Sequence, residues 1–305
     1  MRILNFGSLN IHRVYRVESF MRPGETVSSL GFDLLPGGKG LNQSVAVASA
    51  GSDIFHAGKI GADGEFLLDT LNQAGVNTEY IKSDGIHTGH AVIQVNKYGN
   101  NCILLHSGAN SEITPLEIDE VLSHFEAGDI LILQNEIGHL NYIINSAYDK
   151  YMRVVVNPSP MNDTIKAIDL RKVTYLILNE LEGRELTGES RPSAILDYLL
   201  SIYPHLKIVL TLGKVGSLYA DELHRLQQSV YNVDVADTTA AGDTFLGYFI
   251  SRITMGSPSW SAMRAAAMAA ALCVTKHGGA TSIPLWDDVL NFSMARTEKK
   301  RLAKI

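Results

Sequence analysis

The chain has 305 residues, of which 46% are hydrophobic and 19% charged, a balance typical of a soluble globular protein with a sizeable core. Its net charge is −6 without a long basic block, which argues against nucleic acid or an anionic membrane as a main partner. No apolar run reaches the length of about 18 residues that a membrane-spanning helix needs, and the first apolar run is too short for a signal peptide. Cys102 and Cys273 lie far apart in apolar stretches, so we expect free, buried thiols and a cytoplasmic protein.

Apolar runs of strand length alternate with helical patterns along most of the chain. This order is typical of βαβ units around a mostly parallel sheet, and the continuous apolar strands fit a sheet that is covered on both faces. Strands are expected at residues 3–6, 54–58, 130–133, 154–157, 176–178 and 208–212. Helices are expected at residues 43–50, 64–74, 115–123, 140–151, 180–186, 193–202, 242–254, 259–276 and 285–295, before a basic, solvated tail at 298–304.

Two regions, at about residues 10–36 and 88–106, are strand-like without intervening helices. Residues 90–97 and 101–106 are joined through Tyr98-Gly-Asn and indicate a hairpin. We therefore expect a single α/β domain over residues 1–305, from which a small antiparallel sheet projects as a lid. Because a free sheet edge tends to find a partner strand, we also expect a homodimer through this lid.

A glycine-rich turn, Gly37-Gly38-Lys39-Gly40-Leu-Asn42, precedes the helix expected at 43–50. Three glycines within four positions mark a backbone that bends sharply or approaches a ligand closely. Lys39 and Asn42 add a cation and an amide to this turn. Alone, the turn is weak evidence for a site, because such turns often only connect two elements.

The stretch Asp237-Thr-Thr-Ala-Ala-Gly-Asp243 places a carboxylate at the start of an apolar helix, behind small residues. Backbone N–H groups at a helix start attract anionic oxygens, and an acid there can take a proton from a hydroxyl. The backbone amides of Ala240, Ala241, Gly242 and Asp243 would form an anion hole for a phosphoryl group. The alternative is an ordinary turn with an acidic first-turn residue.

Together the two motifs resemble the signatures of the ribokinase-like sugar kinases, the PfkB family. The resemblance extends from Gly7-Ser-Leu-Asn10 through Ser107-Gly-Ala-Asn110 and Asn157-Pro-Ser-Pro160 to Pro284, in the family's order, and is greatest to its ribokinases. It implies a three-layer α/β/α fold with a β lid. It also implies transfer of a phosphoryl group from ATP, with Mg²⁺, to a sugar hydroxyl, with Asp243 as the general base.

The nucleotide is expected to bind the second half of the chain. Thr211, Gly213 and Gly216 follow a strand and offer a place for phosphates to cross the backbone, although P-loop spacing is absent. The resemblance implies that Asn179 and Glu182 order the magnesium and phosphate region, whereas the residues alone favour a helix N-cap. It further implies a potassium-type cation held by hard oxygen ligands, for which a plain loop is the alternative. The matching positions are Asp237, Thr239, Val274, Gly278 and Ser282.

The residues expected to bind the sugar depart from the family pattern at one position. Ribokinases usually have Asp two residues after the Asn that matches Asn10, and here His12 stands in its place. A neutral histidine offers one donor and one acceptor and cannot accept two hydroxyls at once. The sugar therefore stays open between ribose, another polyol, a modified sugar and a nucleoside, unless His12 lies on the lid surface. The resemblance implies sugar contacts at Asn10, Gly38, Lys39, Asn42 and Glu136.

Two alternatives to a sugar kinase stay open. The first is a nucleoside kinase of the same family, whose base could pack against Ile11, Phe32 and Ile93. The second is a non-catalytic sugar-sensing protein on this fold. His12 and Ala267, where family members often place Asn or His against adenine, favour the sensor, whereas Asp243 and the turn before it favour an enzyme.

Overall fold

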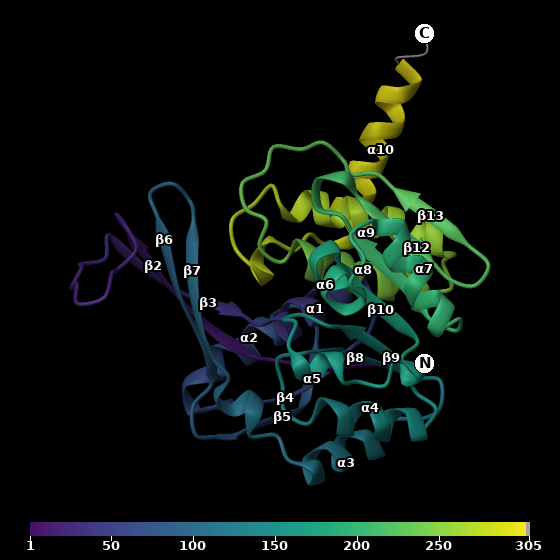
Figure 1. Ribbon diagram of the computed structural model, residues 1–305. Coiled ribbons are helices and arrows are strands. Elements are labelled where there is room, and N and C mark those ends of the chain that lie inside the picture. Colours follow the sequence, from purple (N-terminus) through teal and green to yellow (C-terminus); the bar gives the residue numbers. More distant parts are fainter. Residues whose placement is uncertain (303–305) are drawn as a thin grey trace.

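A nine-stranded sheet forms the centre of the computed structural model, which describes the backbone of residues 1–302 and the side chains of residues 1–295 (Figure 1). Its strands are β1 (Ile3–Phe6), β4 (Phe55–Gly61), β5 (Asn77–Gly85), β8 (Ile130–Gln134), β9 (Arg153–Asn157), β10 (Tyr175–Asn179), β11 (Lys207–Thr211), β12 (Ser217–Ala220) and β13 (Arg225–Gln228). Their order across the sheet is β13-β12-β11-β10-β9-β8-β1-β4-β5. From β11 to β5 all neighbours are parallel, and β12 and β13 add an antiparallel edge.

Helices cover both faces of this sheet, and each face has its own apolar core. One layer consists of α1 (Lys39–Ser49), α2 (Glu65–Gln73), α8 (Ala241–Thr254), α9 (Ser259–Cys273) and α10 (Trp286–Leu302). The other consists of α3 (Pro115–Ser123), α4 (Leu140–Asp149), α5 (Asp163–Lys166), α6 (Glu180–Thr187) and α7 (Pro192–Ile202). Short 3-10 turns are η1 (Ala62–Gly64), η2 (Gly108–Ser111), η3 (Leu170–Lys172), η4 (Gly213–Val215) and η5 (Ala280–Ser282). The three-layer α/β/α fold is therefore confirmed.

The six strands expected from the sequence are all present, and the expected helices are found with shifted ends. The helix expected from residue 43 begins at Lys39, so the glycine-rich turn is partly its first turn. The last helix continues through Leu302, so most of the expected tail at 298–304 is helical, and residues 303–304 lie outside the described residues. None of the helices within residues 1–302 has both the length and the apolar character needed to cross a membrane.

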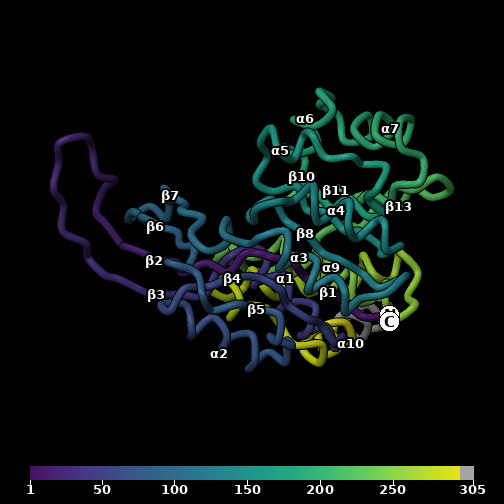
Figure 2. Tube along the Cα trace, turned by 90° about the horizontal axis from the view of Figure 1, so that it is seen from below, coloured from purple at the N-terminus to yellow at the C-terminus, as the bar shows by residue number. Residues whose placement is uncertain are grey.

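The lid sheet projects from the body beside α1 and α2 (Figures 1 and 2). Its strands are β2 (Asn10–Val17), β3 (Gly31–Gly37), β6 (Gly89–Asn96) and β7 (Asn101–His106), in the order β3-β2-β6-β7. The outer pairs are antiparallel, but the central pair, β2 and β6, is parallel, so the expectation of a purely antiparallel sheet was wrong. The reason is that both strands leave the body together, with Asn10 paired to Gly89 at their start.

The two cysteines are free, as expected, but only one of them is buried. Cys273 lies in the core on α9, whereas Cys102 is exposed on β7. The expectation for Cys102 was wrong because β7 is an edge strand, and every residue of it is exposed.

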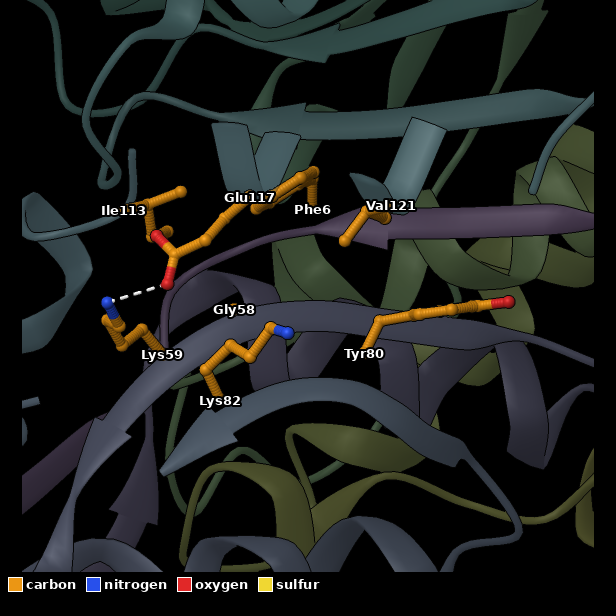
Figure 3. A pocket seen from close by; sticks show the side chains of 8 residues that line it. All are labelled: Phe6, Gly58, Lys59, Tyr80, Lys82, Ile113, Glu117 and Val121. Atoms are coloured by element: carbon orange, nitrogen blue, oxygen red, sulfur yellow. Dashed lines mark ion pairs between the residues drawn. The ribbon is translucent and has the colours of Figure 1, made fainter. Parts of the chain in front are cut away.

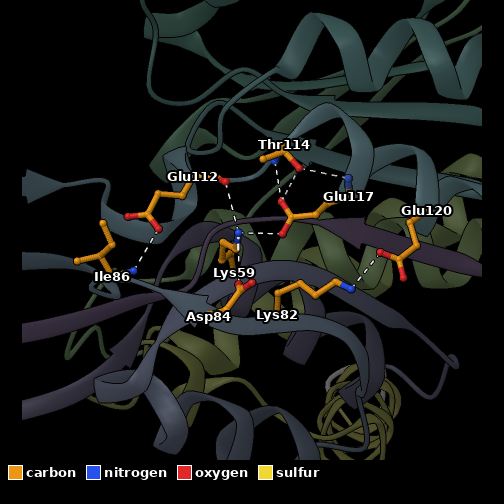
Figure 4. A network of polar contacts seen from close by, with 8 residues as sticks. All are labelled: Lys59, Lys82, Asp84, Ile86, Glu112, Thr114, Glu117 and Glu120. Carbon is orange, nitrogen blue, oxygen red and sulfur yellow. Dashed lines mark hydrogen bonds and ion pairs between the residues drawn. The ribbon is translucent and has the colours of Figure 1, made fainter.

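Near the base of the lid, a buried ion pair joins β4 to α3. Lys59 Nζ lies 2.8 Å from Glu117 Oε1, 3.3 Å from Asp84 Oδ1 and 3.5 Å from the carbonyl of Glu112 (Figure 4). The pair borders a cavity of about 10 Å³ that Tyr80 and Lys82 also line (Figure 3). A cavity of this size holds at most a single water molecule. The cluster is therefore a structural element that ties the sheet to the helix layer.

Glu117→Gln tests the contribution of this cluster to stability. Burial by itself would raise the pKa of Glu117, but hydrogen bonds from Lys59 and Thr114 outweigh it, and the pKa lies below its usual 4.5. A lowered carboxyl pKa stabilises the fold above the unfolded value, and this contribution is lost as pH falls through the folded value. We expect the variant to lose about 1–3 kcal/mol at pH 7, seen as a lower Tm. The difference from the parent should shrink progressively below pH 4.5; an equal Tm at pH 7 contradicts this account.

Candidate active site

The predicted site residues gather at the carboxyl edge of the parallel strands, where loops of doubly wound sheets form ligand sites. Strands β1, β8, β10 and β11 all end at this edge, and α1 and α8 begin there. The two helices are closely packed: a Cβ built on Gly247 of α8 would lie only 2.4 Å from the Cβ of Ala46 on α1. This contact brings the starts of the two helices together.

Asp243 is the point at which the two sequence motifs meet. It lies in the first turn of α8 and is 8% exposed. Its Oδ2 accepts a hydrogen bond from Asn42 Nδ2 at 3.0 Å, and its Oδ1 accepts one from Gln43 Nε2 at 2.9 Å. Segments about 200 positions apart in the chain therefore build one site around this carboxylate.

The backbone before Asp243 forms an open helix start. Ala240 adopts the left-handed conformation with φ 60°, which turns the chain into α8. The amide of Ala241 donates to the carbonyl of Thr238 at 3.3 Å. Those of Ala240, Gly242 and Asp243 have no partner among the described residues. Three of the four amides expected in the anion hole are thus available to an anion, and the fourth makes only a long bond.

Close packing explains the glycines before α1. Gly38 has φ 96°, and a Cβ built there would lie 2.9 Å from the carbonyl oxygen of Ser8. A Cβ on Gly40 would lie 2.3 Å from the amide nitrogen of Ser8. The turn therefore packs directly onto the connection between β1 and β2, which larger residues would prevent.

Lys39 lies among the carboxylates of the site. Burial would lower its pKa, but the nearby charges of Asp243, Glu136 and Glu182 outweigh burial and raise it. Glu136 accepts from the amide of Lys39 at 3.1 Å and from the hydroxyl of Ser8, and burial raises its pKa. One cation thus balances three acidic groups at this edge.

Two of the predicted sugar residues border a cleft of about 440 Å³ between the lid and the loop after β8, whereas His12, Gly38, Lys39 and Asn42 are not among its lining residues. Asn10 and Glu136 line it from the body, and Leu105 lines it from β7. Asn10 is 3% exposed, and its Oδ1 accepts from Asn110 at 2.9 Å. The Nδ2 of Asn10 has no partner within residues 1–302 and is free to donate into the cleft.

His12 belongs to the site and not to the outer surface of the lid. Its ring lies against Gly37, where an added Cβ would come within 2.2 Å of Nε2. Burial lowers the pKa of His12, an effect that Asp243 partly offsets and Lys39 reinforces. The neutral ring presents one donor and one acceptor to the site.

Asn179 and Glu182 lie at the start of α6 and form a capping box. Asn179 Oδ1 accepts from the amide of Glu182 at 2.9 Å, and Glu182 Oε2 accepts from the amide of Asn179 at 2.9 Å. The N-cap interpretation is therefore confirmed. Glu182 is 6% exposed, and burial raises its pKa, whereas the capping bond from the amide of Asn179 and the charge of Lys39 act to lower it.

The predicted nucleotide residues of β11 lie beside this capping box. Thr211 pairs in register with Asn179 across β10 and β11. Gly213 and Gly216 follow with φ 52° and 122°, and a Cβ on Gly216 would lie 2.1 Å from the carbonyl oxygen of Gln228. Both glycines thus permit a tight turn at the carboxyl edge of the sheet.

The five positions expected to hold a monovalent cation also come together. Asp237 Oδ1 accepts from the amide and hydroxyl of Thr239, and its Oδ2 accepts from the amide of Gly278 at 3.2 Å. The carbonyl of Val274 accepts from the amide of Asp237 at 3.2 Å. Ser282 donates to the carbonyl of Gly279 in the same loop. Carboxylate, carbonyl and hydroxyl oxygens dominate this group, a donor set that suits potassium.

Comparison with known proteins matches residues 2–286 to the pfkB family of carbohydrate kinases. The chain belongs to this family. The kinase is 34% identical over 301 residues to the ribokinase of Staphylococcus aureus, covering 94% of this chain and 98% of that protein. It is an ATP-dependent carbohydrate kinase.

Two solved structures share its fold over nearly the full length. The ribokinase of Cryptococcus neoformans in complex with ADP has a TM-score of 0.84 and 31% identity, covering 95% of this chain and 99% of that one. The ribokinase of Arabidopsis thaliana complexed with ribose and ATP has a TM-score of 0.84 and 27% identity, covering 95% and 98%. The ribokinase-like fold with its β lid is thus confirmed.

Several polar residues of the kinase's site were not identified as site residues from the sequence. Ser8, Gln43 and Gln134 all take part in the hydrogen bonds around Asp243 and Glu136, and Asn110 fixes Asn10. The sequence does contain a signal for Gln134, because this polar residue ends an otherwise apolar strand. A buried polar side chain requires a hydrogen-bond partner, so its position indicates a polar site. For the others, the partners come from distant segments and only the fold reveals them.

Proposed function

We propose that the kinase transfers the γ-phosphoryl group of MgATP to a hydroxyl of a ribose-like sugar, with Asp243 as general base. The hydroxyl oxygen bonds to the γ-phosphorus, the bond from that phosphorus to the bridging oxygen of ADP breaks, and the hydroxyl proton passes to Asp243. The meeting of both motifs at Asp243, through its bond to Asn42, is the observation that supports this assignment most strongly.

The start of α8 is proposed to bind the transferred group. The unpartnered amides of Ala240, Gly242 and Asp243, together with Ala241, would hold the developing negative charge. Lys39 would neutralise part of the remaining charge, since the carboxylates around it keep it protonated. Such fixed groups need no reorganisation during the reaction.

The nucleotide is proposed to lie along the ends of β10 and β11. Its phosphates would cross the turn formed by Thr211, Gly213 and Gly216, where open space beside Gly213 leaves the backbone accessible. Asn179 and Glu182 would order the magnesium and phosphate region. Mg²⁺, when bound there, would supply positive charge that neutralises the phosphates.

A monovalent cation is proposed at Asp237, Thr239, Val274, Gly278 and Ser282, immediately before the anion hole. Bound there, potassium would fix the backbone that leads into Ala240. We expect turnover to rise severalfold when potassium replaces a bulky organic cation at equal ionic strength. Equal rates in both buffers would remove this part of the proposal.

The sugar is proposed to contact Asn10, His12, Gly38, Lys39, Asn42 and Glu136, with ribose as the first candidate. Asn10 and Glu136 line the cleft, Asn42 bonds to Asp243, and amide, imidazole and carboxylate groups bond sugar hydroxyls well. His12 cannot accept from two vicinal hydroxyls at once. We therefore propose weaker selection for a sugar's vicinal diol than a carboxylate at this position would give.

A phosphotransfer assay over ribose, 2-deoxyribose, fructose and adenosine, with and without His12→Asp, tests the substrate assignment. We expect a pentose to be phosphorylated, and His12→Asp to lower the KM for ribose about tenfold with little change for 2-deoxyribose, because two charge-assisted bonds replace one neutral bond. Turnover of adenosine alone would support the nucleoside kinase. No turnover of any acceptor, without ATP binding, would support a sugar sensor.

A homodimer through the lid completes the proposal. Phe32 and Leu34 lie on edge strand β3, and Leu104 lies on edge strand β7. All three side chains are about half-exposed or more, with Leu104 at 70%. Apolar side chains beside free sheet edges favour association with a second copy. We expect Leu104→Lys to convert a dimer into a monomer in light scattering. The matched control is Leu116→Lys on α3, where Leu116 is 79% exposed and is not part of the lid sheet; a monomeric parent chain would refute the dimer.

We also propose a cytoplasmic location, which the free thiols support. Cys102 is exposed and unpaired, and exposed thiols persist in reducing compartments. Recovery of the kinase from the secreted fraction of its source cells would exclude this location.

A further inference from the structure

A chain of buried amide side chains leads from a backbone carbonyl to the carboxylate of Asp243. Asn5 on β1, Gln134 at the end of β8 and Gln43 on α1 form it, and we call these three residues the amide relay. Each is at most 1% exposed. Gln134 Nε2 donates to Asn5 Oδ1 at 2.9 Å and to Gln43 Oε1 at 2.7 Å. Gln43 Nε2 then donates to Asp243 Oδ1 at 2.9 Å.

The direction of the relay is fixed at its far end. Asn5 Nδ2 donates to the carbonyl of Gly40 at 2.8 Å, and a carbonyl can only accept. Asn5 must therefore turn its oxygen to Gln134. Gln134 then donates both hydrogens of its amide nitrogen, one to Asn5 and one to the side-chain oxygen of Gln43. The amide nitrogen of Gln43 therefore faces Asp243.

A second carbonyl fixes Gln43 independently. Asn157 Nδ2 donates to the carbonyl of Ile177 at 2.9 Å, which turns its Oδ1 towards Gln43. Gln43 Nε2 lies 3.4 Å from that oxygen. The contacts of Gln43 with Gln134 and with Asn157 require the same orientation of its amide. The amide therefore cannot flip without breaking both contacts.

The relay also contains an acceptor that no partner satisfies. Gln134 Oε1 is buried and has no hydrogen-bond partner among the described residues. Burying an unpartnered acceptor costs free energy, and an apolar side chain of similar length would avoid that cost. The amide nitrogen of Gln134 is thus the part of the side chain that the site uses.

We infer that Gln43, held by Gln134 and Asn5, is a positioning residue that fixes Oδ1 of Asp243 and leaves Oδ2 to react. This inference rests on the proposed role of Asp243 as base. Asn42, the donor to Oδ2, is a proposed sugar contact, and its own Oδ1 has no partner within residues 1–302. Asn42 can therefore turn to the sugar, whereas Gln43 cannot leave Asp243. The two oxygens of one carboxylate thus have separate tasks.

Gln43→Met and Gln134→Met test the relay, because methionine keeps the length of the side chain and removes its amide. We expect kcat to fall about 10- to 100-fold in each, since a misplaced base loses alignment with the hydroxyl. The KM values for sugar and ATP should stay within about twofold, because neither residue is proposed to touch a substrate. Thermal melting establishes that each variant is folded at the assay temperature.

Ser44→Ala is the matched control. Ser44 is as buried as the relay and accepts the other hydrogen of Asn5 Nδ2 at 2.9 Å, but its hydroxyl bonds on to His56 at 2.8 Å and not to the carboxylate of Asp243. Since the carbonyl of Gly40 still fixes Asn5, we expect an unchanged kcat despite a lower Tm. An equal loss of kcat in Ser44→Ala would overturn the inference, because it would show a general effect of packing.

A double-variant experiment separates this inference from the proposed function. In an Asp243→Asn background, Gln134→Met should cause no further loss of kcat, because the relay acts only through the carboxylate. A further loss there, or a parental kcat in both folded methionine variants, overturns the relay alone. A parental rate for Asp243→Asn itself overturns the proposed base instead. If a methionine variant does not fold, the leucine variant at the same position, which also lacks the amide, takes its place and must lower kcat in the same way.

Discussion

Replacing Asp243 by Asn should lower kcat about 10²- to 10⁴-fold, the range typical of removing a general base. An amide cannot take the hydroxyl proton, but it keeps the shape of the carboxylate. The expected measurement is the steady-state rate of ADP formation with the best sugar of the panel. KM for ATP should change little, because the proposed nucleotide contacts lie on β10, β11 and α6.

The surrounding hydrogen bonds explain why this variant should fold. Gln43 and Asn42 each donate to one oxygen of Asp243, so an amide at position 243 creates one clash between donors. Asn42 can relieve it by flipping, because its Oδ1 lacks a partner among the described residues. The control is Asp287→Asn, an exposed first-turn carboxylate on α10, which should retain the parental rate. A similar rate for Asp243→Asn and its parent would remove the proposed base.

Gly242→Ala should lower kcat/KM about 10²-fold or more without reducing stability. Among the glycines of residues 1–302, Gly242 alone combines an ordinary φ with open space, since an added Cβ meets no atom within 4 Å. Nothing in the protein thus requires glycine here. The methyl group would instead occupy the space from which a phosphoryl group reaches the amides, and losing one such contact costs about 10²- to 10³-fold.

The stability measurement makes this prediction specific. Alanine is favoured over glycine in helices by up to about 1 kcal/mol, so Tm should stay constant or rise while activity falls. Gly31→Ala on the lid adds a methyl group with only an ordinary contact to Arg16 and serves as control. A Gly242→Ala variant with parental kcat/KM would show that phosphate does not approach this helix start.

The strands missed from the sequence are β5 at one edge of the main sheet and the antiparallel pair β12 and β13 at the other. β5 contains Glu79, Lys82 and Asp84 around a short apolar pair, and as an edge strand it has no fully buried residue. β12 and β13 are four residues each, and β13 carries polar side chains. Period and hydrophobicity predict central strands well because both of their faces are buried, and this condition fails at the edges.

For the site, the sequence predicted residues within motifs but not the residues that orient them. Asp243, Asn42 and Lys39 were recognised from local patterns at helix starts, and the structure brings them together. Gln43 is adjacent to Asn42, yet its importance depends on Gln134, 91 positions away in the chain. Such partners are set by the packing of β1, β8 and α1, and no local pattern contains that information.

A crystal structure with ADP and the preferred sugar tests the central claim most directly. We predict one sugar hydroxyl at about 3 Å from Asp243 Oδ2, with Gln43 still bonded to Oδ1 and the β-phosphate of ADP directed at the amides of residues 240–243. A sugar whose hydroxyls all lie beyond hydrogen-bond distance of Asp243, or a nucleotide bound away from the start of α8, would contradict the account.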